Sequence, residues 1–289
     1  MTFPITRNTL EESTIDDWMN EFWAIYKEHD MKRGLIDMWA MASEDASQVG
    51  EGVREHDLKK TLNALAHAFC WCASFVARLF NDETIPPTFQ FRKNYPEVEC
   101  FADLIWFKYP AICARCLKAG CICPLLPEAP PKNLQSETMQ QARRSGAPPQ
   151  RVADWESHFS RIYDTAHFIK SIEEIAFHYE EEFGEVFKAI RKLNVPETQL
   201  TSDDLRKRQE NLLEEIADVV SWTLSLSRKK ANDAVDLERY FGTRRDRQYS
   251  NRLRFSAVLW DTYKDESESF LACPVCKGRP CKRDCDTSS

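Results

Sequence analysis

The chain carries the same pattern of apolar residues twice. Four large apolar residues near the start recur 137 positions later. The pairs are Trp18 and Trp155, Phe22 and Phe159, Ile25 and Ile162, and Tyr26 and Tyr163. Steps of three and four residues place such side chains on one face of a helix. The repeat therefore predicts one helical unit that is used twice along the chain.

The alignment of the two copies continues beyond these residues. At the same offset, residues 44–49 align with residues 181–186. Residues 63–71 then align with residues 214–222 at an offset of 151, so the second copy has about fourteen additional residues between its two central helices. We expect an all-α fold of two tandem helical bundles.

The second copy has the clearer helical pattern. Its first central helix has apolar residues at helical spacing from Ile172 to Leu193 and is followed by Asn194 and Pro196, which are typical of a helix end. The next helix is preceded by possible caps at 202–204 and has a buried stripe between Leu212 and Leu224.

Acidic residues lie beside both apolar stripes in this second copy. The pairs Glu182 and Glu185, and Glu215 and Asp218, each lie three residues apart, on neighbouring parts of one helix face. Carboxylates at the edge of a buried face need a compensating charge, and oxygen ligands suit Mg²⁺ or Mn²⁺. The alternative for each pair is a solvated helix face.

The first copy lacks this acidic set. The corresponding positions hold Asp45, Gln48, Ala64 and His67, so one carboxylate remains. This set is too poor for a hard divalent cation, and we expect a structural or regulatory role for this copy. His67 is more consistent with a hydrogen-bonded core residue than with a metal ligand.

The acidic segments resemble the motif of the MazG-like, all-α nucleoside triphosphate pyrophosphohydrolases. That motif is Glu-Glu-x-x-Glu, a loop, and Glu-x-x-Asp, and residues 181–192 and 214–220 are similar to it, although the gap between them is slightly long. The similarity covers roughly residues 154–250. It implies a Mg²⁺-dependent enzyme that directs water to the α-phosphorus of a nucleotide and releases a monophosphate and pyrophosphate. Glu182, Glu185, Glu215 and Asp218 would then hold the metal, and Glu181 or Glu214 would orient the attacking water.

A triphosphate substrate also requires cations. Three basic residues follow the first acidic motif on the same helix, and a later basic segment resembles one that closes many family members. These candidates are Lys188, Arg191 and Lys192, then Arg244, Arg245 and Arg247. A solvated surface cation is the alternative for each of them. Trp222 lies one turn beyond the acids and suits base stacking, but Trp71 persists in the first copy, so helix packing explains both at least as well.

Each copy is followed by a cluster of cysteines. The first contains Cys113, Cys116, Cys121 and Cys123, and the second contains Cys273, Cys276, Cys281 and Cys285. Four thiolates on short loops suit a structural Zn²⁺ site, with an Fe–S cluster or a redox dithiol as the alternative. The predicted organisation is a degenerate repeat at 1–123, a Pro-rich linker at 124–150 with a short helix at 136–144, and an intact repeat at 151–289.

Composition and charge limit the remaining possibilities. A net charge of −7 argues against broad affinity for nucleic acid or membranes, and no apolar run is long enough to span a bilayer. We expect a cytoplasmic protein whose copies form an intramolecular pseudo-dimer and assemble as a homo-oligomer. No Gly-rich phosphate loop is present. The alternative to an enzyme is a nucleotide-binding sensor or scaffold whose zinc knuckles contact a partner.

Overall fold

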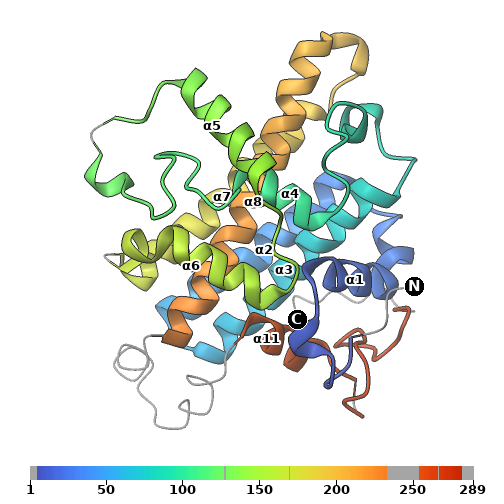
Figure 1. Ribbon diagram of the computed structural model, residues 1–289. Helices are drawn as coiled ribbons and strands as arrows, with labels where there is room; N and C mark the ends of the chain where they lie inside the picture. The colour runs from blue at the N-terminus through green and yellow to red at the C-terminus, as the bar shows by residue number, and fades with distance from the viewer. Residues whose placement is uncertain (1–4, 127, 169, 233–253, 266, 282–289) are drawn as a thin grey trace.

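The computed structural model describes residues 5–126, 128–168, 170–232, 254–265 and 267–281 (Figure 1). These residues form helices and connecting loops, and within them the only β-type pairing is two isolated bridges. The expected all-α fold is confirmed for the described part of the chain.

Among the described residues, the helices occur in the same order on both sides of residue 150. The first half contains α1 (Ile15–Asp30), α2 (Leu35–Arg54), α3 (Leu58–Asn81) and α4 (Phe101–Lys108). The second half contains α6 (Val152–Phe168), α7 (Ile172–Leu193), α8 (Ser202–Asn232) and α11 (Phe255–Tyr263). The helix between them, α5 (Lys132–Ser145), is longer than the segment expected in the linker. The repeat boundaries at 123 and 151 stay predictions.

Local sequence explains where the central helices of the second half begin and end. The hydroxyl of Ser171 and the carboxylate of Glu174 form a capping box at the start of α7, which ends at Leu193 before Asn194. At α8 the cap is the Thr201 hydroxyl, which accepts a hydrogen bond of 3.1 Å from the backbone N–H of Asp204. The additional residues of this half form the 194–201 connection and the first turns of α8.

The short fourth helix of each half packs against the long third helix of the other half. Helix α4 contacts α8, and α11 contacts α3, so the two halves exchange these elements (Figure 1). Helices α2 and α7 also pack together near the middle of the molecule. As a result, a site on α8 has a first-half helix as one of its walls.

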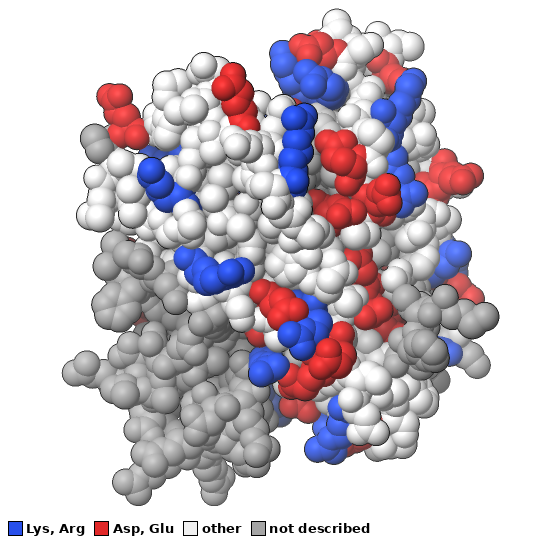
Figure 2. All heavy atoms as spheres, in the orientation of Figure 1, with Lys and Arg blue, Asp and Glu red and all other residues white. Residues whose placement is uncertain are grey.

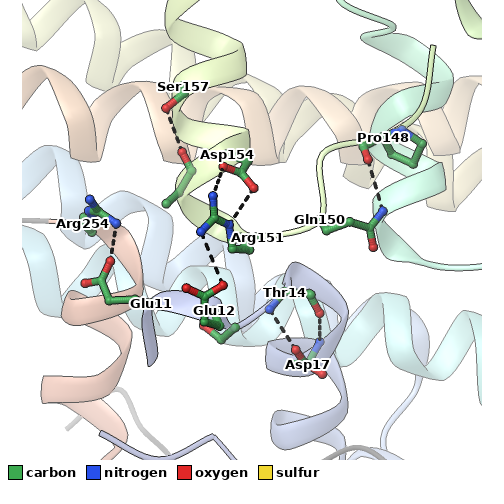
Figure 3. A network of polar contacts seen from close by, with 12 residues as sticks. Glu11, Glu12, Thr14, Asp17, Pro148, Gln150, Arg151, Asp154, Ser157 and Arg254 are labelled. Carbon is green, nitrogen blue, oxygen red and sulfur yellow. Dashed lines mark hydrogen bonds and ion pairs between the residues drawn. The ribbon is translucent and has the colours of Figure 1, made fainter. Parts of the chain in front are cut away.

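The two halves also meet where α1 and α6 begin. Thr14 and Arg151, which lie 137 positions apart, form an antiparallel bridge. The backbone N–H of Ile15 donates to the carbonyl of Gln150 at 3.3 Å, and the N–H of Val152 donates to the carbonyl of Ser13 at 3.1 Å. Figure 3 shows this junction, where the Arg151 side chain lies between Asp154 of α6 and Glu12 of the first half.

One hydrophobic cluster contains buried residues from both halves. Trp39 of α2 stacks on Phe183 of α7 with 5.3 Å between ring centroids, and its Nε1–H donates to the Phe183 carbonyl at 2.9 Å. Within the described residues α3 is the one helix with the length and composition of a membrane span, but 89% of its most apolar window is buried inside the protein. That burial is typical of a core helix.

Candidate functional site

Three of the four expected metal ligands come together. Carboxylate oxygens of Glu182 on α7 and of Glu215 and Asp218 on α8 all lie within 4.8 Å of one another. Oxygens bound to one Mg²⁺ at about 2.1 Å lie at most roughly 4.2 Å apart, so small side-chain movements bring this trio into ligand geometry. We call these three residues the acidic trio.

The fourth expected ligand, Glu185, lies outside the acidic trio. Its carboxylate accepts a hydrogen bond from Lys188 at 2.6 Å, and about half of its side chain is exposed. Glu182 and Glu185 share a helix face only approximately, because three residues cover less than a full turn. Here that difference turns Glu182 toward α8 and Glu185 toward solvent.

Two first-half residues at the end of α4 reach the acidic trio. The Lys108 ammonium forms an ion pair with one Asp218 oxygen, and the Tyr109 hydroxyl donates a hydrogen bond to the other. Both side chains are mostly or fully buried. Because α4 is exchanged between the halves, these partners lie 110 and 109 positions from Asp218 in sequence, and our reading of the sequence did not identify them.

The charges of the site are strongly coupled. Burial and the nearby Asp218 carboxylate raise the pKa of Glu182 to about 8, although Lys108 and the Trp222 hydrogen bond oppose this shift. Burial also raises the pKa of Glu215. For Lys108, burial lowers the pKa, but Asp218 and the neighbouring glutamates outweigh it and the net shift is upward. The lysine therefore carries a full positive charge beside the carboxylates.

The two candidate catalytic acids have different surroundings. Glu181 is half exposed and accepts a hydrogen bond from His178 Nδ1 at 2.9 Å. Glu214 is half-buried, and burial raises its pKa while the charges of Lys108 and Arg143 lower it. Because Glu214 interacts electrostatically with the same lysine as Asp218, it belongs to the surroundings of the acidic trio more closely than Glu181 does.

The expected phosphate-binding cations are less well placed. Lys188 pairs with Glu185, and the Arg191 and Lys192 side chains are exposed on α7. The other three candidates, Arg244, Arg245 and Arg247, lie outside the described residues. Among the described residues in Figure 2, acidic and basic side chains are interspersed on this face.

Trp222 contacts the acidic trio directly. Its indole Nε1–H donates to Glu182 Oε1 at 3.1 Å, and its ring stacks on the His178 ring with 5.2 Å between centroids. Trp71, its counterpart, lies under the Arg33 guanidinium at 5.3 Å. Each tryptophan thus makes its own contacts within the protein, and Trp222 also orients a candidate ligand.

The equivalent site in the first half lacks the ion pair of Lys108 and Asp218 but keeps one contact. Tyr263 of α11 hydrogen-bonds to His67 Nδ1 at 3.0 Å, which matches the contact between Tyr109 and Asp218. Burial lowers the pKa of His67 to about 4, so the ring is neutral. Thr262 occupies the position of Lys108, and its hydroxyl donates to the Val258 carbonyl at 2.9 Å. Lys108 thus accompanies the site that holds the acidic trio, and the equivalent site has a threonine at the corresponding position.

The first cysteine cluster has the geometry of a metal site. The Sγ atoms of Cys113, Cys116, Cys121 and Cys123 lie within 4.8 Å of one another, and the Cys113 and Cys123 sulfurs are 3.6 Å apart. Ligands at about 2.3 Å from a tetrahedral Zn²⁺ lie roughly 3.8 Å apart, so the four thiols fit that ion. All four are free thiols.

The second cluster repeats this geometry as far as it is described. Cys273, Cys276 and Cys281 converge in the same way, and Cys285 lies outside the described residues. In both clusters the N–H of the residue after the second cysteine donates to the carbonyl of the first, at 2.8 Å for Leu117 and 2.9 Å for Lys277. Both of these residues have a left-handed backbone, with φ of 59° and 56°. The two loops therefore form the same tight turn.

No family model, curated protein or solved structure matches this chain.

Proposed function

We propose that the chain is a Mg²⁺-dependent nucleotide pyrophosphohydrolase with a MazG-like arrangement of helices. The observation that carries this proposal is the convergence of Glu182, Glu215 and Asp218 from two helices, with Lys108 among them. Anionic oxygens suit a hard divalent cation, and a nearby ammonium suits the phosphate chain that such a cation accompanies.

The acidic trio would hold the metal, which would supply polarisation of the phosphoryl group when bound. Glu214 is the better candidate for the group that orients and deprotonates water, since its raised pKa favours proton uptake. The water oxygen would bond to the α-phosphorus, the bond from that phosphorus to the bridging oxygen would break, and pyrophosphate would leave. Cleavage at the α position follows from the family resemblance.

Trp222 and Tyr109 would orient the ligands. The indole donates to Glu182 and the phenol donates to Asp218, so each leaves the other lone pairs of its carboxylate available to a cation. The proposed Zn²⁺ ions in the cysteine clusters would have structural roles, because a closed four-cysteine site has no open position for a substrate.

Release of pyrophosphate from the common NTPs and dNTPs, measured with Mg²⁺, tests this proposal. We expect turnover by the wild type and a loss of at least about 100-fold in Glu182→Gln, which keeps the side-chain shape but removes the anionic ligand. Lys207→Met on helix α8 is the surface control, because Lys207 pairs with exposed Asp203. If wild type and Glu182→Gln both bind nucleotide and neither hydrolyses it, the protein is a sensor and the enzyme proposal fails.

A further inference from the structure

The first cysteine cluster lies against the second half of the chain. The backbone N–H of Cys121 donates to the carbonyl of Ile162 in α6 at 2.6 Å. Cys113, Cys116 and Cys121 form one buried apolar cluster with Ile162 and Ala166. The loop that would bind metal is therefore part of the contact between the halves.

The segment that reaches the acidic trio is fixed on the same helix. His158 Nε2 of α6 donates to the Tyr109 carbonyl at 2.8 Å. The Tyr109 ring packs edge-on against Phe159 and Tyr163 of α6, at 5.3 and 5.9 Å between centroids. Three residues lie between Tyr109 and Cys113, so α6 holds the loop at one end of this short segment and Asp218 holds the side chain at the other.

The second cluster makes the matching contact on α1. The N–H of Cys281 donates to the carbonyl of Ile25 at 2.7 Å, and Ile25 is the counterpart of Ile162. His29 Nε2 donates to the Cys281 carbonyl at 2.8 Å. This loop follows Tyr263, whose hydroxyl meets His67 where the first half has no acidic trio.

We propose that the metal centre at Cys113, Cys116, Cys121 and Cys123 positions Lys108 and Tyr109 in the acidic site of the other half. The inference rests on the proposed Mg²⁺ site for its functional meaning, but its structural basis is independent of that proposal. A loop with four ligands on one ion has a single conformation, whereas the same eleven residues without the ion have many. Loss of the ion therefore frees the Cys121 contact with α6 and, with it, the segment that carries Lys108 and Tyr109.

The two clusters provide a matched pair of variants. Cys116→Ser removes a ligand of the first centre, and Cys276→Ser removes the corresponding ligand of the second. Three quantities are measured on each full-length variant: zinc content, Mg²⁺ affinity by calorimetry, and hydrogen exchange of the peptide that covers residues 104–112. Both variants are expected to lose about one Zn²⁺ and to be destabilised.

We expect exchange at residues 104–112 to accelerate in Cys116→Ser alone. Mg²⁺ affinity should shift in that variant alone, because release of Lys108 from Asp218 favours the metal and release of Tyr109 disfavours it. Normal Mg²⁺ affinity and exchange in a Cys116→Ser protein that has lost zinc would overturn the proposal, as would equal changes in both variants. If the wild type binds no Mg²⁺, the proposed function fails, and the exchange of residues 104–112 in the two variants then decides this inference alone.

Discussion

Lys108, the last residue of α4, forms a mostly buried ion pair with Asp218 on α8, so each half of the chain supplies one charge of this pair. The pair exists because the fourth helices are exchanged. It also places an ammonium where a divalent cation is proposed to bind. Lys108 should therefore have opposite effects on Mg²⁺ affinity and on nucleotide affinity.

Replacement of Lys108 by Met is expected to raise Mg²⁺ affinity and to lower nucleotide affinity. The ammonium competes with the metal for Asp218 but would bind a phosphate oxygen once the metal is present. Removing one partner of a buried pair costs about 3 kcal/mol in the metal-free protein. Calorimetric titration with Mg²⁺, and then with a non-hydrolysable nucleotide, checks both signs. Unchanged nucleotide affinity would limit Lys108 to a structural role.

The raised pKa of the Glu182 carboxyl predicts that the stability of the protein depends on pH. Its pKa of about 8 in the folded protein lies above its ordinary value of 4.5, so the folded state binds an extra proton between those values. The contribution of this carboxyl to the free energy of unfolding should therefore fall as pH rises from about 4.5 to 8. Glu182→Gln should remove this slope and stabilise the metal-free protein at pH 8 by about 1 to 2 kcal/mol, allowing for solvent screening. Denaturant unfolding of both proteins at several pH values measures this difference in the free energy of unfolding.

The same carboxyl makes Mg²⁺ binding release a proton. Below pH 8 the metal must displace the Glu182 proton, so the dissociation constant should fall by up to about ten-fold per pH unit as pH rises. Calorimetry in buffers of different ionisation enthalpy counts the released protons. A pH-independent affinity between pH 6 and 8 would show that Glu182 is not a ligand.

Tyr109 and Tyr263 offer a matched comparison. The Tyr109 hydroxyl donates to a carboxylate and the Tyr263 hydroxyl bonds to a neutral histidine. Tyr109→Phe should cost about 1.5 to 3 kcal/mol of stability and weaken Mg²⁺ binding several-fold, whereas Tyr263→Phe should cost about 1 kcal/mol and leave Mg²⁺ binding unchanged. Thermal unfolding and Mg²⁺ titration of both variants provide the data. Equal effects on Mg²⁺ would argue against a specific role for Tyr109.

Substitutions of two glutamates test whether the metal ligands are the acidic trio alone or also include Glu185, as the sequence predicted. Glu215 belongs to the acidic trio, and Glu185 pairs with Lys188 in solvent. Glu215→Gln should weaken Mg²⁺ binding by at least ten-fold, and Glu185→Gln by less than two-fold, because an exposed ion pair contributes little. Mg²⁺ titrations of both proteins measure this. A strong effect of Glu185→Gln would mean that this side chain turns inward when the metal binds.

The spacing of apolar residues was sufficient to predict much of the second-half helical bundle. The apolar spacing in α7 and α8 fixed which faces are buried, and that in turn placed Glu182, Glu215 and Asp218 near one another. It did not separate Glu182 from Glu185, because both lie at the edge of the stripe and the exact rotation of α7 depends on its packing against α2 and α8.

The cation of the site had no local signal. Lys108 lies between an apolar helix and a cysteine cluster, and its contact with Asp218 depends on the exchange of helices between the halves. One sequence comparison contained a hint: Lys108 aligns with Thr262, and Asp218 aligns with His67. The repeat thus changes from a charged pair to two neutral residues at positions that turn out to be neighbours.

The bridge between Thr14 and Arg151 joins equivalent points of one continuous chain. In an assembly of two identical subunits, every substitution appears at both symmetric positions. Here one gene encodes both partners as separate stretches, so Lys108 and Asp218 can be kept while Thr262 and His67 diverge. A single chain can therefore place a charged pair at one set of positions and neutral residues at the corresponding set in its other half.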